Sequence, residues 1–222
     1  MREPVKAFNS VAESYDAWYR HPQGAQILEA ELNLLSRQLP PCGLGLEVGA
    51  GTGAFAERMK SPCRDVVCID PSSSMIIRAR DRGLKTIIGV GDHLPLRSKT
   101  FDFSYMATVV EFLTEPVKTF TEVKAVIKEN SALSILFINP ASSWGELYRE
   151  IGLKGDPVFR HAKLIGLHGV TRLLSEAGYE IEASMGTLTT GPMEPNVGAE
   201  IMAPSDACGV IAVKAKAIKK NA

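Results

Sequence analysis

Short apolar runs alternate with amphipathic stretches along most of the chain. The runs rich in β-branched and other apolar residues predict strands at 43–48, 65–70, 86–90, 101–107, 133–138, 179–185 and 209–217. Helical spacing of apolar residues, with Ser, Pro and Gly at the ends, predicts helices at 7–19, 24–39, 53–60, 71–83, 114–127 and 167–178. This alternation predicts an α/β fold: a Rossmann-like, mostly parallel, seven-stranded sheet with helices on both faces and an antiparallel C-terminal strand.

Two segments lie outside this rhythm. Residues 1–40 precede the first strand and predict an N-terminal helical cap. Residues 140–166 hold aromatics, glycines and charges with only broken helical periodicity, and they follow the fifth strand. We expect a single domain over residues 1–222, with the 140–166 segment as an insertion on the substrate side.

Composition narrows the class of protein. The 25 basic and 25 acidic side chains cancel, and without a basic stripe we expect no nucleic-acid partner. The N-terminus lacks the apolar core of a signal peptide, and no apolar run is long enough to span a membrane. The four cysteines lack the spacing of a zinc site, so we expect no metal. We expect them to be buried free thiols in a reduced, cytoplasmic protein; they are Cys42, Cys63, Cys68 and Cys208.

The first strand runs into a glycine-rich loop, Gly45-Leu-Gly-Leu-Glu-Val-Gly-Ala-Gly-Thr-Gly-Ala-Phe55. Gly49, Gly51 and Ala54 satisfy the dinucleotide fingerprint, in which exposed backbone N–H groups receive a ligand. Asp70, at the end of the second strand, can accept the hydroxyl groups of a ribose. These features fit NAD(P) and S-adenosylmethionine equally well.

The residues after the third strand favour S-adenosylmethionine. In Gly91-Asp-His-Leu-Pro-Leu96, Asp92 can accept from an adenine amino group and the His93 amide can donate to a ring nitrogen. Leu94, with Met75 or Ile76, offers apolar surface for the ring. Glu47 would repel a pyrophosphate but suits the ammonium group of an amino acid.

The order of these motifs resembles the class I S-adenosylmethionine-dependent methyltransferases, within them the small-molecule branch of ubiquinone/menaquinone-biosynthesis type. The motifs are Glu47-Val-Gly-Ala-Gly-Thr-Gly53, Asp70-Pro-Ser-Ser-Ser-Met75, Gly91-Asp-His-Leu-Pro-Leu96 and Phe101-Asp-Phe-Ser-Tyr105. The opening Phe8-Asn-Ser-Val-Ala-Glu-Ser-Tyr-Asp16 is also similar to that branch, so the resemblance covers roughly residues 8–138. One departure is Ile127-Lys-Glu-Asn-Ser-Ala132, where the family has a Pro-Gly-Gly turn; Asn130 tolerates the left-handed backbone that such a turn needs.

The resemblance implies a role for each matching residue. The methionine part would lie on the glycine loop and the ribose on Asp70, with the adenine at Asp92 and His93. The implied cofactor-binding residues are Glu47, Gly49, Gly51, Gly53, Asp70, Pro71, Met75, Asp92, His93, Leu94, Thr108 and Tyr15. Tyr15 or Tyr19 would close over the site. The implied reaction is methyl transfer to a small-molecule acceptor by in-line displacement, in a monomer or homodimer.

The acceptor side has no signature of its own. Alignment of the reactants is the main requirement, so a dedicated acid or base is not obligatory. If the acceptor needs deprotonation, the candidates are His161, His21 and Glu111. Four aromatic residues have two interpretations, as the lining of a substrate pocket or as a satellite core: Tyr19, Trp144, Tyr148 and Phe159. Two alternatives stay open: a non-catalytic S-adenosylmethionine-binding protein, and an NAD(P)-dependent oxidoreductase, for which no Tyr-x-x-x-Lys follows the fourth or fifth strand.

Overall fold

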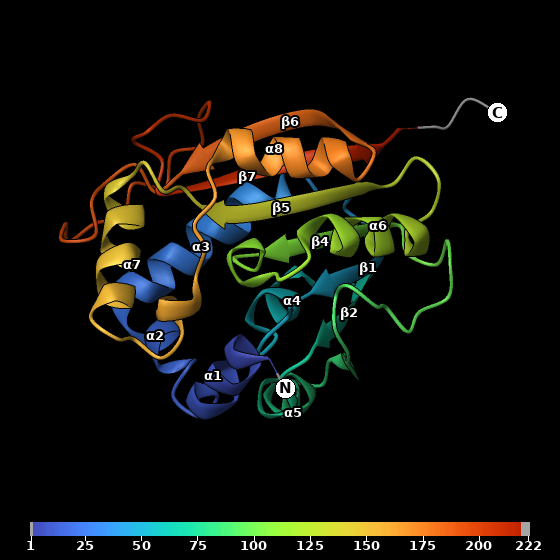
Figure 1. The fold of residues 1–222 in the computed structure, drawn as a ribbon, viewed down its shortest axis with the longest axis horizontal. Coiled ribbons are helices and arrows are strands. Elements are labelled where there is room, and N and C mark those ends of the chain that lie inside the picture. The colour runs from blue at the N-terminus through green and yellow to red at the C-terminus, as the bar shows by residue number, and fades with distance from the viewer. Residues whose placement is uncertain (1, 219–222) are drawn as a thin grey trace.

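A seven-stranded sheet in the order β3-β2-β1-β4-β5-β7-β6 forms the centre of the computed structural model, which describes residues 2–218 (Figure 1). The first five strands are parallel, whereas β7 is antiparallel to β5 and β6 is antiparallel to β7. The strands are Gly43–Val48 (β1), Arg64–Asp70 (β2), Lys85–Ile88 (β3), Phe103–Ala107 (β4), Ala132–Ile138 (β5), Tyr179–Thr187 (β6) and Val210–Ala217 (β7). The predicted fold class is therefore confirmed.

Helices cover both faces of the sheet (Figure 1). The helices α3 (Pro22–Ser36), α4 (Ala54–Met59) and α5 (Ser73–Asp81) bury residues in one core cluster, for example Leu35, Phe55 and Ala79. The helices α6 (Pro116–Val126) and α8 (Leu167–Glu176) contribute Phe120 and Leu174 to a second cluster. The central strands thus carry apolar side chains on both faces, as a parallel sheet requires.

The chain order places a crevice at the carboxyl ends of β1 and β4. From β1 the chain moves outward through β2 to β3, and then returns to the other side of β1 as β4. Ligands of open α/β sheets bind where the strand order reverses in this way. Figure 1 shows α1 (Glu3–Val11), α2 (Ala17–Arg20) and α7 (Ser143–Leu153) at the end to which the arrowheads of these strands point.

Two predicted segments differ from the structure. The helix expected at 7–19 begins at Glu3 and ends at Val11, where the amides of Ser14 and Tyr15 both donate to the Val11 carbonyl in a tight turn. The 140–166 segment contains the regular helix α7, capped by the Ser142 hydroxyl, which accepts from the Gly145 amide.

The cysteines at the start of β1 and β2 form a disulfide, so the expectation of free thiols is wrong for Cys42 and Cys63. The parallel register pairs Gly43 with Arg64, which brings the residues before them together with 4.8 Å between their Cα atoms. Cys68 and Cys208 are free and buried, as expected. Between residues 2 and 218, no helix is long and apolar enough to cross a membrane.

Candidate active site

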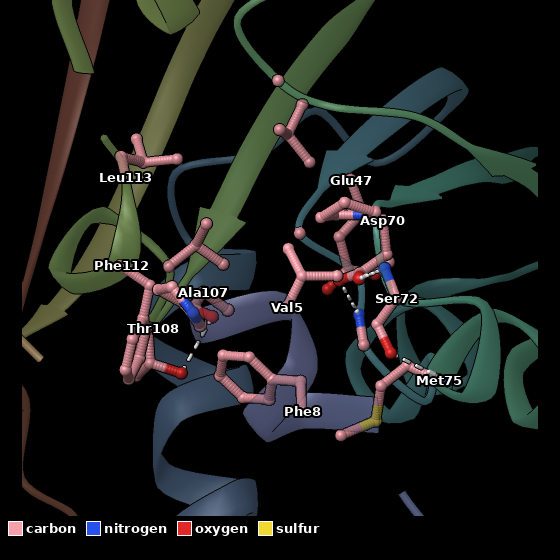
Figure 2. A pocket seen from close by; sticks show the side chains of 18 of the residues that line it. Val5, Phe8, Glu47, Asp70, Ser72, Met75, Ala107, Thr108, Phe112 and Leu113 are labelled. Atoms are coloured by element: carbon pink, nitrogen blue, oxygen red, sulfur yellow. Dashed lines mark hydrogen bonds between the residues drawn. The ribbon is translucent and has the colours of Figure 1, made fainter. Parts of the chain in front are cut away.

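The loops that follow β1, β2 and β4 enclose a cavity at the carboxyl edge of the sheet, the glycine-loop cavity (Figure 2). In Figure 2, Glu47, Asp70 and Ser72 lie on one side and Thr108 and Phe112 on the other, with Phe8 of α1 between them. The predicted residues that line it are Glu47, Gly49, Gly51, Asp70, Pro71, Met75, Asp92, Thr108, Tyr15 and Tyr19.

Asp70 braces the glycine loop against the start of α5. One of its carboxylate oxygens accepts from the Gly51 amide at 2.9 Å and the other from the Ser72 amide at 2.8 Å. Gly51 has a φ of +54°, a backbone conformation that glycine adopts at little cost. Burial raises the pKa of Asp70 to about 6. Each carboxylate oxygen can accept more than one hydrogen bond, so both still have capacity for a ligand's hydroxyl groups.

Glu47 presents a buried carboxyl group to the same cavity. The Tyr105 hydroxyl donates to its Oε2 at 3.1 Å, and burial raises the pKa of Glu47 to about 8. A cation placed beside Glu47 would favour the ionised carboxylate, because opposite charges stabilise each other strongly where water is excluded.

The loop after β3 contributes Asp92 to the cavity but not the two residues after it. Asp92 is buried and its carboxylate pairs with Arg2 at 2.6 Å. The His93 amide instead closes a turn onto the Val90 carbonyl, and the His93 side chain is exposed. Leu94 packs in the core cluster beneath α6. The structure therefore does not bring the expected adenine contacts of His93 and Leu94 to the cavity wall.

Gly53 also lies outside the lining. An added Cβ at Gly53 would lie 2.3 Å from Leu84, so this glycine allows close packing between α4 and the segment before β3. Its φ of +78° places it as the left-handed residue that begins α4. The third glycine of the motif thus shapes the loop without facing the cavity.

The N-terminal segment is tied to the rim of the cavity at two places. The Asn9 side chain accepts from the Ser72 hydroxyl at 2.8 Å, next to Asp70. Asp16 accepts from the Thr52 hydroxyl at 2.7 Å and pairs with Arg82 at 2.6 Å. These contacts hold α1 and the following turn over the glycine loop and the start of α5.

A second cavity, here called the aromatic cavity, adjoins the first. Its lining includes the predicted substrate-side residues Tyr19, Trp144, Tyr148 and Phe159. The two cavities share the lining residues Phe8, Tyr15, Tyr19, Thr108 and Phe112. The ring of Phe112 lies 5.0 Å from Phe8 and 6.3 Å from Phe159, and Tyr148 stacks on Phe159 at 4.4 Å, centroid to centroid. A molecule in the aromatic cavity would therefore meet one in the glycine-loop cavity at Thr108 and Phe112.

The three candidates for a general base lie in different surroundings. His21 is exposed beside Trp18, and His161 accepts from the Arg160 side chain; neither lines a cavity. Glu111 is buried in the short helix η1 (Val110–Phe112), where its Oε1 accepts from the Ile138 amide, while its Oε2 has no hydrogen-bond partner among the described residues. Burial raises the pKa of Glu111 to about 7. None of the three candidates is among the residues that line the two cavities, and Glu111 directly precedes the shared lining residue Phe112.

Sequence reasoning missed Glu31, a buried acid of α3 in the lining of the aromatic cavity. Burial, and next the nearby Glu111 charge, raise its pKa to about 8. The signal was present in the helical spacing: Glu31 is four residues after Ile27, three after Leu28 and four before Leu35, all apolar. An acid on the apolar face of an amphipathic helix is unusual enough to suggest a ligand.

Four carboxyl groups with raised pKa values predict how stability depends on pH in the ligand-free protein. Glu31 and Glu47 have pKa values of about 8, Glu111 of about 7 and Asp70 of about 6, whereas carboxyl groups of unfolded chains titrate near 4. The folded state thus holds more protons between pH 4 and 8, so the free energy of unfolding should fall as pH rises through this window. We expect a loss of several kcal/mol between pH 5.5 and 8.5 in urea denaturation; a rise over that range would contradict these assignments.

Comparison with known proteins places the chain in a family. Residues 46–135 match the family described as "Methyltransferase domain". An uncharacterized protein of Methanocaldococcus jannaschii is 34% identical over 79% of this chain and 82% of its own length. A malonyl-[acyl-carrier protein] O-methyltransferase of Geobacter sulfurreducens is 32% identical over 58% of this chain, and that match spans 50% of the relative.

A solved structure shares nearly the whole fold. It is a Thermotoga maritima protein described as an S-adenosylmethionine-dependent methyltransferase and possible histamine N-methyltransferase, with a TM-score of 0.85 at 23% identity, covering 96% of this chain and 99% of that one. In this chain, the glycine loop between β1 and α4 lines the glycine-loop cavity together with Glu47 and Asp70. The chain therefore belongs to the class I S-adenosylmethionine-dependent methyltransferases.

Proposed function

We propose that this methyltransferase acts on a small-molecule acceptor bound in the aromatic cavity. The observation that carries the proposal is the junction of the two cavities at Phe8, Tyr15, Tyr19, Thr108 and Phe112. The acceptor site is enclosed by α7 and the N-terminal helices and is lined mainly by aromatic and aliphatic side chains, which suits a compact organic molecule.

In the glycine-loop cavity, we assign the cofactor contacts as follows. Asp70 accepts the ribose hydroxyls, and Glu47 faces the ammonium group of the methionine part, with the backbone at Gly49 and Gly51 beside it. Asp92 is assigned to the adenine amino group. To accept a hydrogen bond from it, the Asp92 carboxylate gives up its ion pair with Arg2. Pro71 and Met75 supply apolar surface.

The cofactor supplies an activated methyl group, and the chain's contribution is to position the acceptor and exclude water. Thr108 and Phe112 lie where the two cavities meet, and residues from the N-terminal helices and from the 140–166 insertion line the acceptor side. Holding two reactants in line can accelerate their reaction as much as an effective concentration on the order of 10⁵–10⁸ M would.

A binding and turnover experiment tests this proposal. Calorimetry should detect S-adenosylmethionine and S-adenosylhomocysteine but not NAD(P)H, which separates the methyltransferase from the oxidoreductase alternative. A panel of small metabolites is then incubated with S-adenosylmethionine, and acceptor-dependent S-adenosylhomocysteine is measured. Turnover on a protein or nucleic-acid substrate alone would overturn the small-molecule assignment. The cytoplasmic location and the monomer or homodimer state stay predictions.

A further inference from the structure

The aromatic cavity is acidic and has no basic side chain in its lining. Its charged lining residues are Glu31 and Asp156, and among residues 2–218 no Lys, Arg or His lines it. The Asp156 carboxylate caps the start of η2 (Phe159–His161), where it accepts from the Val158 and Phe159 amides. Glu31 is thus the lining carboxyl group that remains available to a ligand.

Among residues 2–218, the Glu31 carboxyl group has no polar partner. Glu31 is 6% exposed, yet within the described residues its carboxyl group makes no hydrogen bond or ion pair. Burial raises the pKa of Glu31, and the nearby Glu111 charge raises it further. Within residues 2–218, Glu111 Oε2 is itself buried without a hydrogen-bond partner. Two buried acids without a counter-charge are costly, because buried charges are normally paired.

The rings around Glu31 suit a positive charge. Tyr15, Tyr19 and Tyr148 all line the cavity with Glu31. Burial raises their pKa values, and the nearby Glu31 charge raises them further. Aromatic faces attract cations, most strongly where water is excluded. The same surroundings disfavour a carboxylate acceptor, which would meet two acids and no base.

We propose that the acceptor is an amine carried on an apolar or aromatic body, and that Glu31 is the group that binds its nitrogen. This inference rests on the proposed function and names the substrate class of the aromatic cavity. An ammonium group there pairs with the Glu31 carboxylate, while the body of the molecule packs on Tyr148, Phe159 and Trp144.

The chemistry balances with Glu31 as proton acceptor. The ammonium nitrogen gives one proton to the Glu31 carboxylate, and its freed electron pair forms the new bond to the methyl carbon. The carbon–sulfur bond breaks with its electron pair on sulfur, so the sulfonium becomes a neutral thioether. The product is the N-methylammonium ion, and Glu31 is left protonated.

The test compares three probes that share a phenyl body, with S-adenosylhomocysteine bound to the full chain. We expect 2-phenylethylamine to bind at least tenfold more tightly than 2-phenylethanol, and 3-phenylpropanoate to bind most weakly. Calorimetry at pH 7 in buffers of different ionisation enthalpy should also detect proton release on binding of the amine, because Glu31 is protonated in the empty cavity. Equal or tighter binding of the alcohol or the carboxylate would overturn the inference.

Two variants assign the effect to Glu31. Glu31→Gln should lose at least tenfold in 2-phenylethylamine affinity and lose the proton release, with S-adenosylhomocysteine affinity within twofold of the unmodified protein. Glu146→Gln, an exposed acid on α7 outside the lining, should change neither. Unchanged amine binding by Glu31→Gln would refute the role. Failure of S-adenosylhomocysteine to bind the unmodified chain would instead count against the proposed function, so failure of the proposed function can be distinguished from failure of the Glu31 inference. The three probes also test the inference on the unmodified protein, without any variant.

Discussion

Replacing Asp70 by alanine should weaken S-adenosylhomocysteine binding by about 100-fold, or about 2.7 kcal/mol. Two effects add. The substitution removes the carboxylate assigned to the ribose hydroxyls, and hydrogen bonds to charged groups contribute about 1.5–3 kcal/mol each. It also removes the acceptor of the Gly51 and Ser72 amides, which fixes the glycine loop relative to α5.

The measurement is calorimetry at pH 8, where Asp70 is ionised because its pKa is about 6. Asp81→Ala provides a matched control, since Asp81 is an exposed acid at the C-terminal end of α5 and lies outside the cavity. An affinity of Asp70→Ala within threefold of the unmodified protein would place the ribose elsewhere.

The glycines Gly49 and Gly51 should respond differently to alanine. A Cβ at Gly49 would lie 2.6 Å from both γ-carbons of Val109, at a φ of +74°. Overpacking and an unfavourable backbone each cost on the order of 1–3 kcal/mol, so Gly49→Ala should lower the melting temperature by roughly 5–10 °C. The cost falls on the fold as a whole, because Val109 follows the central strand β4.

A Cβ at Gly51 meets no atom within 4 Å, although its φ is +54° and the residue lines the glycine-loop cavity. Gly51→Ala should therefore cost only about 1 kcal/mol of stability, while the added methyl group occupies space beside the cofactor and lowers affinity about tenfold. Calorimetric melting and ligand titration on both variants check this pair. The reverse pattern, with Gly51→Ala the less stable of the two, would show that the loop is arranged differently.

Local signals account for what could be predicted from the sequence. The strands were found because each is a short apolar run bounded by turn residues, and the left-handed turn assigned to Asn130 is confirmed by its φ of +64°. Asp70, at the end of β2, could be placed beside Gly51 because parallel strands end at one edge of the sheet.

What could not be predicted depends on contacts between distant segments. Helix α7 was obscured by Gly145 and Gly152, glycines that weaken a helical pattern; Gly145 is needed because a Cβ there would lie 2.3 Å from the Asn139 carbonyl oxygen. The apolar spacing around Glu31 marks it as an unusual acid, but the side chains that enclose it, such as Tyr148, come from distant segments of the chain. The turn that uses the His93 amide is likewise invisible in a motif match.

The disulfide between Cys42 and Cys63 closes a covalent ring, and that ring contains β1, the glycine loop and α4. With a sequence separation of 21 between its two cysteines, the ring restricts the unfolded chain enough to favour the folded state by about 3 kcal/mol in the chain-entropy description. While the disulfide is intact, the unfolded chain already holds the two ends of the segment that bears the glycine loop together. Reduction of this one bond would return that loop-closure entropy to the unfolded chain and lower the folding stability of the protein while leaving every cavity-lining side chain chemically intact.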